Sequence, residues 1–582
     1  MKTIYSFLTI SALAVCLTAC NDDISTGGVP TEESNSVYLR FALDLPSGSR
    51  SQTTSGEDDD YVTSEDGTEV GKDRENRINQ IMLVFTDTDN TYLTSTNVTS
   101  VSPSANNEYV ITIPPERLQE YVSPEAEAGA EGTGTTEQRL ANVYVYCNPT
   151  DELRALAGAS AGSAQVENLI NKAHTITDSE NASVWRDNNF LMSNADTKNQ
   201  IALPTSWNEH LSSSKPFNIG TLKVERSVAR FDYKAIHENN IYRVRESLDA
   251  DSDDDTDNPG IYIQLTDIAL INMSKSFYYL RRVSDNGLNT NATVCGVETK
   301  TNYVVDTDAE QKLNYTTAEA WSAKNANFFY NLEEPITWQW TSLADISENE
   351  EDNWGSEPDE EEGYHIWRYA IENTIPQDAN GKDELQKNGI TTGVVFRAKI
   401  GHDENYSGNA TWTAGEPIYI FKDILYGDWE AVGKYAKAHS TEEVAYAYQA
   451  VESNDYTKEE AGFTEYKQNA DGNYYAYYYY WNRHNDNNQN GIGGTNPVMG
   501  PMEFAVVRNN VYKLSVDAIF RFGYPEGETP DPEKPDEEKP KPEEDPDPEP
   551  DPKVFLKVNV EVLPWVVRVN EIEFGNGDSG TN

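Results

Sequence analysis

Apolar and polar residues alternate strictly over residues 37–45. The apolar positions are Val37, Leu39, Phe41, Leu43 and Leu45. A period of two is the side-chain repeat of a β-strand with one buried face, so this pattern predicts a strand. The stretch that follows, up to residue 74, is rich in Ser, Thr, Gly and acidic residues without periodicity, which predicts an exposed loop.

Many short β-type runs, separated by Asn, Pro, Ser, Gly and Asp, fill the rest of the chain. A helical patch is predicted over residues 151–156 and 166–173, with Asp151 as a candidate N-cap. Short strands with turn signals between them and few helices indicate antiparallel β-sandwiches, so we expect a mainly β fold. The predicted strands after the first are 77–87, 109–113, 141–147, 222–233, 261–271, 277–283, 367–374, 393–400, 417–421, 474–481, 504–507 and 511–520.

The C-terminal region has an unusual order. Residues 524–553 contain ten Pro, thirteen Asp or Glu and four Lys, which predicts an extended, semi-stiff spacer. Residues 554–562 then alternate apolar and polar positions, and a second β-type run follows at 566–574 after Leu563-Pro564-Trp565. A chain that ends in strand-forming sequence beyond such an arm needs a sheet to receive that strand.

The net charge of the chain excludes some classes of partner. The 582 residues carry 98 acidic and 45 basic side chains, a formal net charge of -53. Such a chain repels phosphate backbones and anionic bilayers, so neither nucleic acid nor a membrane surface is an expected partner. No interior run of about 18 apolar residues is present, so we expect no membrane span after processing of the N-terminus.

The first 20 residues have the features of a secretory signal. A charged start at Lys2 precedes an apolar stretch at 4–15, and Leu17-Thr18-Ala19-Cys20 resembles a bacterial lipobox, which places a lipid on Cys20. Of the other cysteines, Cys147 and Cys295 lie far apart in or beside apolar stretches. Two small buried thiols are favoured over a disulfide bridge.

No constellation of residues points to catalysis or to a cofactor. Gly158–Gly162 matches Gly-x-Ser-x-Gly, but that motif requires a strand before it and a parallel α/β sheet. Residues 486–491 copy half of a calcium loop, yet Pro497 stands where the bidentate Glu belongs. The tyrosines of 474–481 could line a sugar groove, although core and rim packing is favoured. We expect no enzyme activity, no metal and no cofactor.

Several segments, in their order along the chain, resemble the fimbrillins, the subunits of protease-assembled type V pili of Bacteroidales, and most closely their minor-fimbrium shaft branch. The resemblance covers nearly all of the exported chain. The acidic spacer is longer than is usual in that family. The segments are Leu17–Cys20, the strand ending at Arg50, Val224–Asp232, Ser274–Arg282, Glu372–Thr374, Thr391–Phe396, Met502–Leu514 and Val562–Trp565.

The resemblance implies two transthyretin-like β-sandwich domains with long loops and a C-terminal donor-strand arm. It implies export as a lipoprotein at Cys20, cleavage between Arg50 and Ser51 by an Arg-specific or trypsin-like protease, and displacement of the strand 37–45. The expected organisation is signal peptide 1–20, propeptide 21–50, domains 51–222 and 223–523, spacer 524–553 and donor segment 554–582. The implied donor residues, with 554–563 as their stem, are Val566, Val567, Val569, Ile572 and Phe574.

The implied partners are identical subunits in a head-to-tail filament, the protease, and anchor and tip fimbrial subunits. The precursor would be lipid-anchored at the outer membrane and the mature protein would stand in a surface fimbrium. Lys72, Arg74 and Arg77 are alternative cleavage points, with Arg77 too close to the next strand. The competing hypothesis is a surface lipoprotein that stays monomeric and binds glycans or host proteins.

Overall fold

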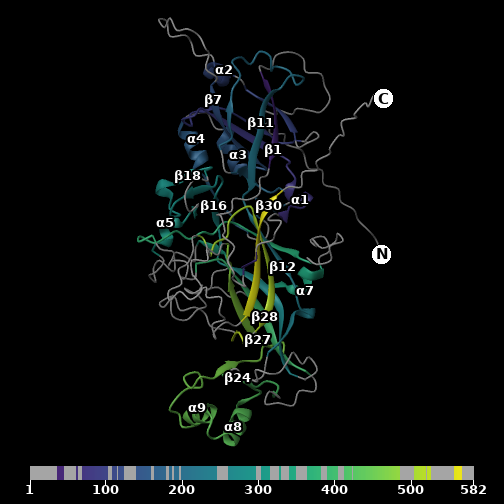
Figure 1. Cartoon of the computed structure of the whole chain (residues 1–582), viewed down its shortest axis with the longest axis vertical. Helices are drawn as coiled ribbons and strands as arrows, with labels where there is room; N and C mark the ends of the chain where they lie inside the picture. The colour runs from purple at the N-terminus through teal and green to yellow at the C-terminus, as the bar shows by residue number, and fades with distance from the viewer. Residues whose placement is uncertain are drawn as a thin grey trace, which may run out of the picture.

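The computed structural model describes residues 36–44, 61–62, 69–101, 108–114, 116–122, 139–158, 163–178, 182–186, 189–195, 198–244, 260–296, 303–314, 327–329, 340–348, 363–381, 390–403, 412–422, 424–484, 502, 504–519, 521–525 and 556–566. Within these ranges the protein is mainly β, as the alternating runs predict. Figure 1 shows an elongated molecule with an N-terminal sheet at one end, a β-sandwich in the middle and a small helical body at the other end.

The N-terminal sheet curls until its two end strands meet. Its strand order is β5-β4-β7-β9-β11-β1-β6, with β10 paired to β7. The Thr94 and Thr96 hydroxyls of β5 donate to the carbonyls of Pro114 and Thr112 at 3.1 and 3.0 Å, which joins β5 to the end of β6. The strands are β1 (Val37–Asp44), β4 (Ile81–Thr86), β5 (Tyr92–Val98), β6 (Glu108–Ile113), β7 (Leu140–Cys147), β9 (Met192–Asn194), β10 (Gln200–Ala202) and β11 (Phe217–Arg226).

Two further sheets form the C-terminal sandwich. One has the order β2-β30-β28-β12-β22 with β3 on β30, and the other has the order β13-β14-β23-β27-β29 with β21 on β14. Their inner faces touch where the Tyr233 and Phe396 rings lie 6.0 Å apart. The strands are β2 (Tyr61–Val62), β3 (Glu69–Val70), β12 (Ala229–Lys234), β13 (Ile241–Arg243), β14 (Ile261–Ile271), β21 (Thr341–Ser342), β22 (His365–Ala370), β23 (Gly393–His402), β27 (Tyr474–Trp481), β28 (Asn510–Ile519), β29 (Tyr524–Pro525) and β30 (Leu556–Val566).

Helices and short strands complete the described part. Helices α2, α3 and α4 belong to the N-terminal body, and α1 precedes β4. The helices are α1 (Asp73–Asn76), α2 (Glu116–Val122), α3 (Asp151–Gly158), α4 (Ser163–Ile170), η3 (Glu238–Asn240), η4 (Asn289–Asn291), α5 (Ala309–Lys312) and α7 (Leu343–Glu348). The short strands are β8 (Ala173–Thr175), β15 (Met273–Ser274), β16 (Ser276–Tyr278), β17 (Arg282–Ser284), β18 (Thr293–Val294), β19 (Tyr303–Val304) and β20 (Phe328–Phe329).

Parallel pairs are an addition to the expected antiparallel sandwiches. β1 runs parallel to β11, β12 runs parallel to β28, and both β2 and β3 run parallel to β30. Parallel neighbours need a long crossover, so no short turn between them marks the pairing in the sequence. The predicted run 222–233 is also divided into β11 and β12, and 504–507 holds only an isolated bridge between Val506 and Asn373.

A helical body is inserted between β23 and β27, of which the sequence patterns predict only one strand, at 417–421. Strands β24 (Ile418–Phe421), β25 (Ile424–Tyr426) and β26 (Thr464–Tyr466) pair with one another beside helices α8 (Trp429–Ala438) and α9 (Glu443–Glu452). The Asp428 side chain caps α8 by accepting from the Ala431 amide at 2.7 Å. This body has its own apolar core and lies at the end of the molecule away from the N-terminal sheet (Figure 1).

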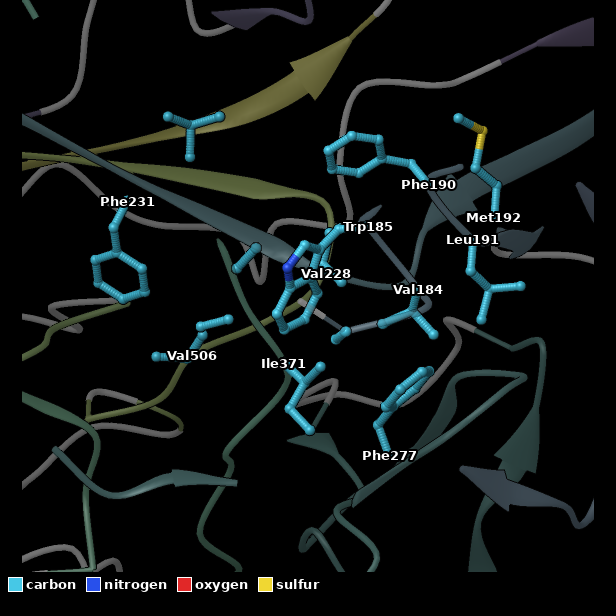
Figure 2. Close-up of a cluster of buried hydrophobic side chains, with 14 of the residues drawn as sticks. Val184, Trp185, Phe190, Leu191, Met192, Val228, Phe231, Phe277, Ile371 and Val506 are labelled. Atoms are coloured by element: carbon cyan, nitrogen blue, oxygen red, sulfur yellow. The ribbon is translucent and has the colours of Figure 1, made fainter. Parts of the chain in front are cut away.

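The N-terminal sheet and the sandwich share an apolar junction. Figure 2 shows side chains from both bodies converging there, with Trp185 and Phe190 on one side and Ile371 and Val506 on the other. The Phe190 ring packs edge-on against Tyr369 of β22 at 4.9 Å. Strand β8 of the N-terminal body also pairs with β16, so backbone hydrogen bonds cross the same junction.

Buried ions join the two bodies beside this cluster. Glu75 of α1 is fully buried; it accepts from the Arg230 Nη1 of β12 at 3.0 Å and from the Tyr369 hydroxyl at 2.6 Å. Arg226, at the end of β11, bonds to Asn76, and burial lowers the pKa of Arg226 to about 9, so it stays charged at neutral pH. A buried charge without its partner is costly, so this network fixes α1 between the two bodies.

Two other sequence predictions can be compared with the structure. Cys147 and Cys295 are buried free thiols, which confirms the preference for two thiols over a bridge. None of the helices within the described ranges has the length and apolar character that crossing a membrane requires.

The Glu75→Gln substitution tests the ion network. Loss of the carboxylate leaves Arg230 with Asp232 as its remaining buried counter-ion and removes the charge that also stabilises Arg226, so the buried cluster lacks one negative charge and we expect a loss of about 3–5 kcal/mol in stability. Calorimetric unfolding of the full chain measures it as a lower melting temperature. Glu430→Gln, which removes an exposed partner of Lys434 on α8, is the matched control and should leave the melting temperature unchanged. Equal melting temperatures for the two variants would contradict this role of Glu75.

Candidate assembly site

Strand β1 occupies the interior of the N-terminal sheet. It pairs antiparallel with β6 over residues 37–42 and parallel with β11 over residues 39–44. The sequence prediction of a strand at 37–45 is therefore confirmed over the described residues 37–44. Both edges of β1 are hydrogen bonded, so β6 and β11 touch each other only through this strand.

The apolar face of β1 is buried as the alternation predicts. Val37, Leu39 and Phe41 have no exposed surface and Leu43 is 8% exposed. The Phe41 ring stacks on Tyr109 of β6 with centroids 5.7 Å apart, and burial raises the pKa of Tyr109. Burying four such side chains contributes roughly 6–12 kcal/mol as an upper bound.

An irregularity in β11 allows both ladders to form. The register between β1 and β11 shifts between Arg40 and Phe41, opposite Ile219 and Gly220. Gly220 has a φ of 83°, a conformation that L side chains rarely adopt. The bulge places one extra residue in β11, so β11 stays paired with β1 on both sides of it. β1 itself keeps an unbroken period of two.

An aromatic cluster marks the start of the β1 position. The Tyr38 amide donates to the His210 carbonyl at 2.9 Å. The His210 ring packs against Phe217, the first residue of β11, with centroids 5.2 Å apart, and the buried Trp207 ring lies 5.4 Å from Phe217. These contacts fix the start of β1, in addition to the hydrogen bonds along its two edges.

The C-terminal strand β30 lies in the sandwich of its own chain. It pairs antiparallel with β28 from Ile519↔Leu556 to Asn510↔Pro564. We call β30 the stem, because it contains most of the predicted stem 554–563; it extends to Val566, and the other proposed donor residues follow it directly. The stem ends at Val566, beside the start of β28 and therefore on the junction side of the sandwich.

The stem differs from the predicted C-terminal pattern. The sequence predicts a break at Leu563-Pro564-Trp565, whereas β30 continues through it to Val566. Proline has no N–H to donate, so it is tolerated where one strand edge needs no bond. Among the described pairs, the edge away from β28 has partners at 560–561 and 565–566 but none at 562–564.

Residues near the proposed cleavage site cover the second edge of the stem. Tyr61 and Val62 of β2 pair with Val560 and Glu561, and β3 (Glu69–Val70) pairs with 565–566. We call β2 and β3 the stem clamp. The clamp continues directly into α1, whose Glu75 is held in the junction.

The sequence analysis missed the stem clamp and α1. The two clamp strands are two residues long and α1 has four, too short for a periodic pattern. The only local signal is Glu75, which stands three residues after Lys72. The Glu75 carboxylate accepts from the Lys72 amide at 2.7 Å.

Several predicted site residues lie outside the described residues. Only the backbone of Val566 is described, as the last residue of β30. The roles of these residues therefore stay predictions. The residues outside are Cys20, Leu45, Arg50, Ser51, Val567, Val569, Ile572 and Phe574.

The described residues also bear on the chemical motifs weighed earlier. Gly158 ends helix α3, so a helix and not a strand precedes the Gly-x-Ser-x-Gly motif. In β27, Tyr474, Tyr478 and Trp481 are buried, in line with core packing. Within the described ranges, no group of three or more His, Cys, Asp or Glu side chains is placed to hold a metal ion.

Comparison with known proteins gives one family match. Residues 472–571, which include β27, β28 and the stem, match the family described as "Major fimbrial subunit protein type IV, Fimbrillin, C-terminal". No curated protein matches the chain.

Solved structures similar to the chain include two proteins from Porphyromonas gingivalis. The tip fimbrial protein Mfa3 with C-terminal truncation has a TM-score of 0.33 at 10% identity, over 91% of this chain and 100% of Mfa3. A fimbrilin (fimA) has a TM-score of 0.35 at 15% identity, over 91% of this chain and 98% of the fimbrilin.

The Leu39→Ala substitution tests how far the N-terminal sheet depends on β1. Removing a fully buried leucine side chain should cost about 2–5 kcal/mol, read as a lower melting temperature of the uncleaved chain. Tyr38→Ala, on the partly exposed opposite face of β1, should have a much smaller effect. Similar losses from both variants would show that the face of β1 carrying Leu39 is not the stabilising one.

Proposed function

We propose that this chain, assigned to the fimbrillin family through residues 472–571, is a structural shaft subunit of a surface fimbrium that supports adhesion. In this proposal the subunits polymerise head to tail by donor-strand exchange, the replacement of a strand in one subunit by a strand of the next. Identical subunits are the main partners, and anchor and tip subunits end the filament.

The observation that carries the proposal is the place of β1. Its removal would leave an apolar trough between β6 and β11 and two rows of unpaired backbone groups. Such edges accept a strand from another chain, because that strand restores both the hydrogen bonds and the apolar burial. Donor and acceptor surfaces differ, so the contact repeats as an open filament.

The C-terminal end supports the donor role. The stem is paired on both edges, so the proposed donor is the chain that follows it, chiefly Val567, Val569, Ile572 and Phe574, while Val566, also predicted as a donor residue, is the last residue of the stem. The clamp anchors the base of the donor to the subunit that supplies it. A donor with a fixed base forms a lasting link between two subunits.

Export and processing complete the proposal. The precursor is lipidated on Cys20 at the outer membrane, and an Arg-specific or trypsin-like protease cuts between Arg50 and Ser51. The cut separates β1 from the rest of the chain, so proteolysis acts as the switch. The mature subunit then stands in the fimbrium outside the cell.

Arg50 is the proposed cleavage point because the stem clamp must remain part of the mature subunit. A cut after Lys72 or Arg74 would separate the clamp from the mature subunit and would fall in or beside α1. Proteases bind an extended chain, so a cut there also requires α1 to unfold and Glu75 to leave its partners. Arg50 lies upstream of the clamp and avoids both costs.

N-terminal sequencing of processed subunits tests the cleavage point. We expect the mature chain to begin at Ser51 and the Arg50→Gln variant to remain uncut and monomeric. Arg74→Gln is the matched control and should be processed normally. A mature chain that begins after Lys72 or Arg74 would contradict this assignment.

Deletion of residues 567–582 tests the donor. Protease treatment should convert the intact chain into ladders on unboiled gels, and the deleted chain should give none because no strand is left to insert. The deletion spares β30, whereas removal of 554–582 would also expose β28 and disturb folding. Mixing cut deleted chain with intact chain should shorten the ladders, because the deleted chain accepts a donor but provides none. Ladders formed by the deleted chain alone would refute the donor assignment.

A further inference from the structure

A groove lies between the helical body and the end of the sandwich farthest from the N-terminal sheet. Its volume is about 1140 Å³, and its lining comes from β24, β26, the loop before β26 and residues 521–525. The polar lining includes four cations, Lys422, Lys458, Lys467 and Arg521, against two carboxylates, Glu459 and Glu465. The lining thus carries a net charge of about +2 on a chain whose net charge is -53.

Two of the lining lysines, Lys422 and Lys458, have hydrogen-bond donors left for a further carboxylate. Lys422 pairs with Glu443, and the two side chains are 64% and 69% exposed. Lys458 lies 3.7 Å from Glu465, over the rings of Tyr419 and Trp429. The Lys422–Glu443 pair is exposed and contributes little, whereas Lys458 is about one-third exposed and also donates to the Tyr419 hydroxyl. An ammonium group has three donors, so either lysine can bind another carboxylate.

The acidic spacer starts at this groove. Tyr524 and Pro525 are lining residues, and the chain continues directly into residues 526–553. Those 28 residues contain thirteen Asp or Glu and four Lys, which leaves a net charge of -9, and nine prolines. Proline-rich segments dock in grooves that present aromatic rings, and of the aromatic residues in this lining Tyr524 is partly exposed, whereas Phe463 and Tyr475 are buried.

The spacer also returns near the groove. The stem begins at Leu556, directly opposite Ile519, which is only six residues before Pro525. The two ends of the spacer are therefore within about 25 Å of each other, whereas 28 extended residues would reach roughly 85 Å. A much shorter connection would span this gap, so the spacer has more residues than the connection itself requires.

We propose that the groove binds the acidic proline-rich segment 526–553 of its own chain. Carboxylates of the segment pair with Lys422, Lys458, Lys467 and Arg521, and its prolines pack on the partly exposed ring of Tyr524. A tether this short gives an effective concentration in the millimolar range, so binding within one chain outcompetes binding to a second copy. The contact would fix where the C-terminal arm leaves the sandwich, and it does not depend on donor-strand exchange.

Carbodiimide cross-linking of the full-length, uncleaved chain tests the contact, because this reagent joins an amine to a carboxylate only when the two touch. Mass spectrometry should find segment 526–553 linked to Lys422, Lys458 and Lys467. The links should fall at least fivefold in 1 M salt, where exposed charges are screened. Lys434 and Lys437 of α8 are matched controls outside the lining. The Lys434–Glu430 pair, at 2.9 Å, shows that the reagent works.

Two outcomes would overturn the proposal. One is a yield of segment links at Lys434 and Lys437 equal to that at the groove lysines. The other is a mixture of isotope-labelled and unlabelled protein in which the links join different copies. As a second arm, Lys458→Gln with Lys467→Gln should abolish the links at those positions and lower the remaining yield at Lys422. An unchanged yield at Lys422 would also count against a shared groove.

Discussion

The N-terminal sheet depends on one strand that the rest of its sheet cannot replace. β1 satisfies the edges of both β6 and β11, and its four buried side chains fill the space between them. No described strand apart from β6 and β11 borders that position, so we expect the loss of β1 to leave two open edges. A sheet interior normally provides permanent stability. Here the covalent connection from β1 to the elements that follow it is the segment 45–60, which ends at the stem clamp.

The residues after that link connect the two ends of the molecule. The stem clamp covers the free edge of β30, and α1 places Glu75 between the N-terminal sheet and the sandwich. One stretch, 61–76, therefore bonds to the C-terminal strand and to the junction at once. The apolar cluster and the buried ion pairs hold the N-terminal sheet and the sandwich together at this junction.

Features that depend on neighbouring residues, such as single strands and their buried faces, could be predicted from the sequence. The period of two in 37–45 identified β1 and its buried face, and similar runs identified β14, β23, β27 and β28. The parallel pairing of β1 with β11, the clamp and the role of Glu75 depend on residues more than a hundred positions apart, so no window of sequence contains them. Helices α8 and α9 did have a local signal, the cap at Asp428 before an amphipathic stretch, and the β-rich context hid it.

In the proposed filament, charge explains why an inserted strand is a suitable means of joining the subunits. Several of the 45 basic residues, among them Arg226, Arg230, Arg508 and Lys312, are buried against carboxylates or carbonyl groups. Most of these buried cations are paired with buried carboxylates, so they leave the net charge of -53 almost unchanged, and copies of the chain repel one another on average. Backbone hydrogen bonds and apolar burial are not weakened by that repulsion at close range. A contact made by an inserted strand can thus hold acidic subunits end to end while their flanks stay apart.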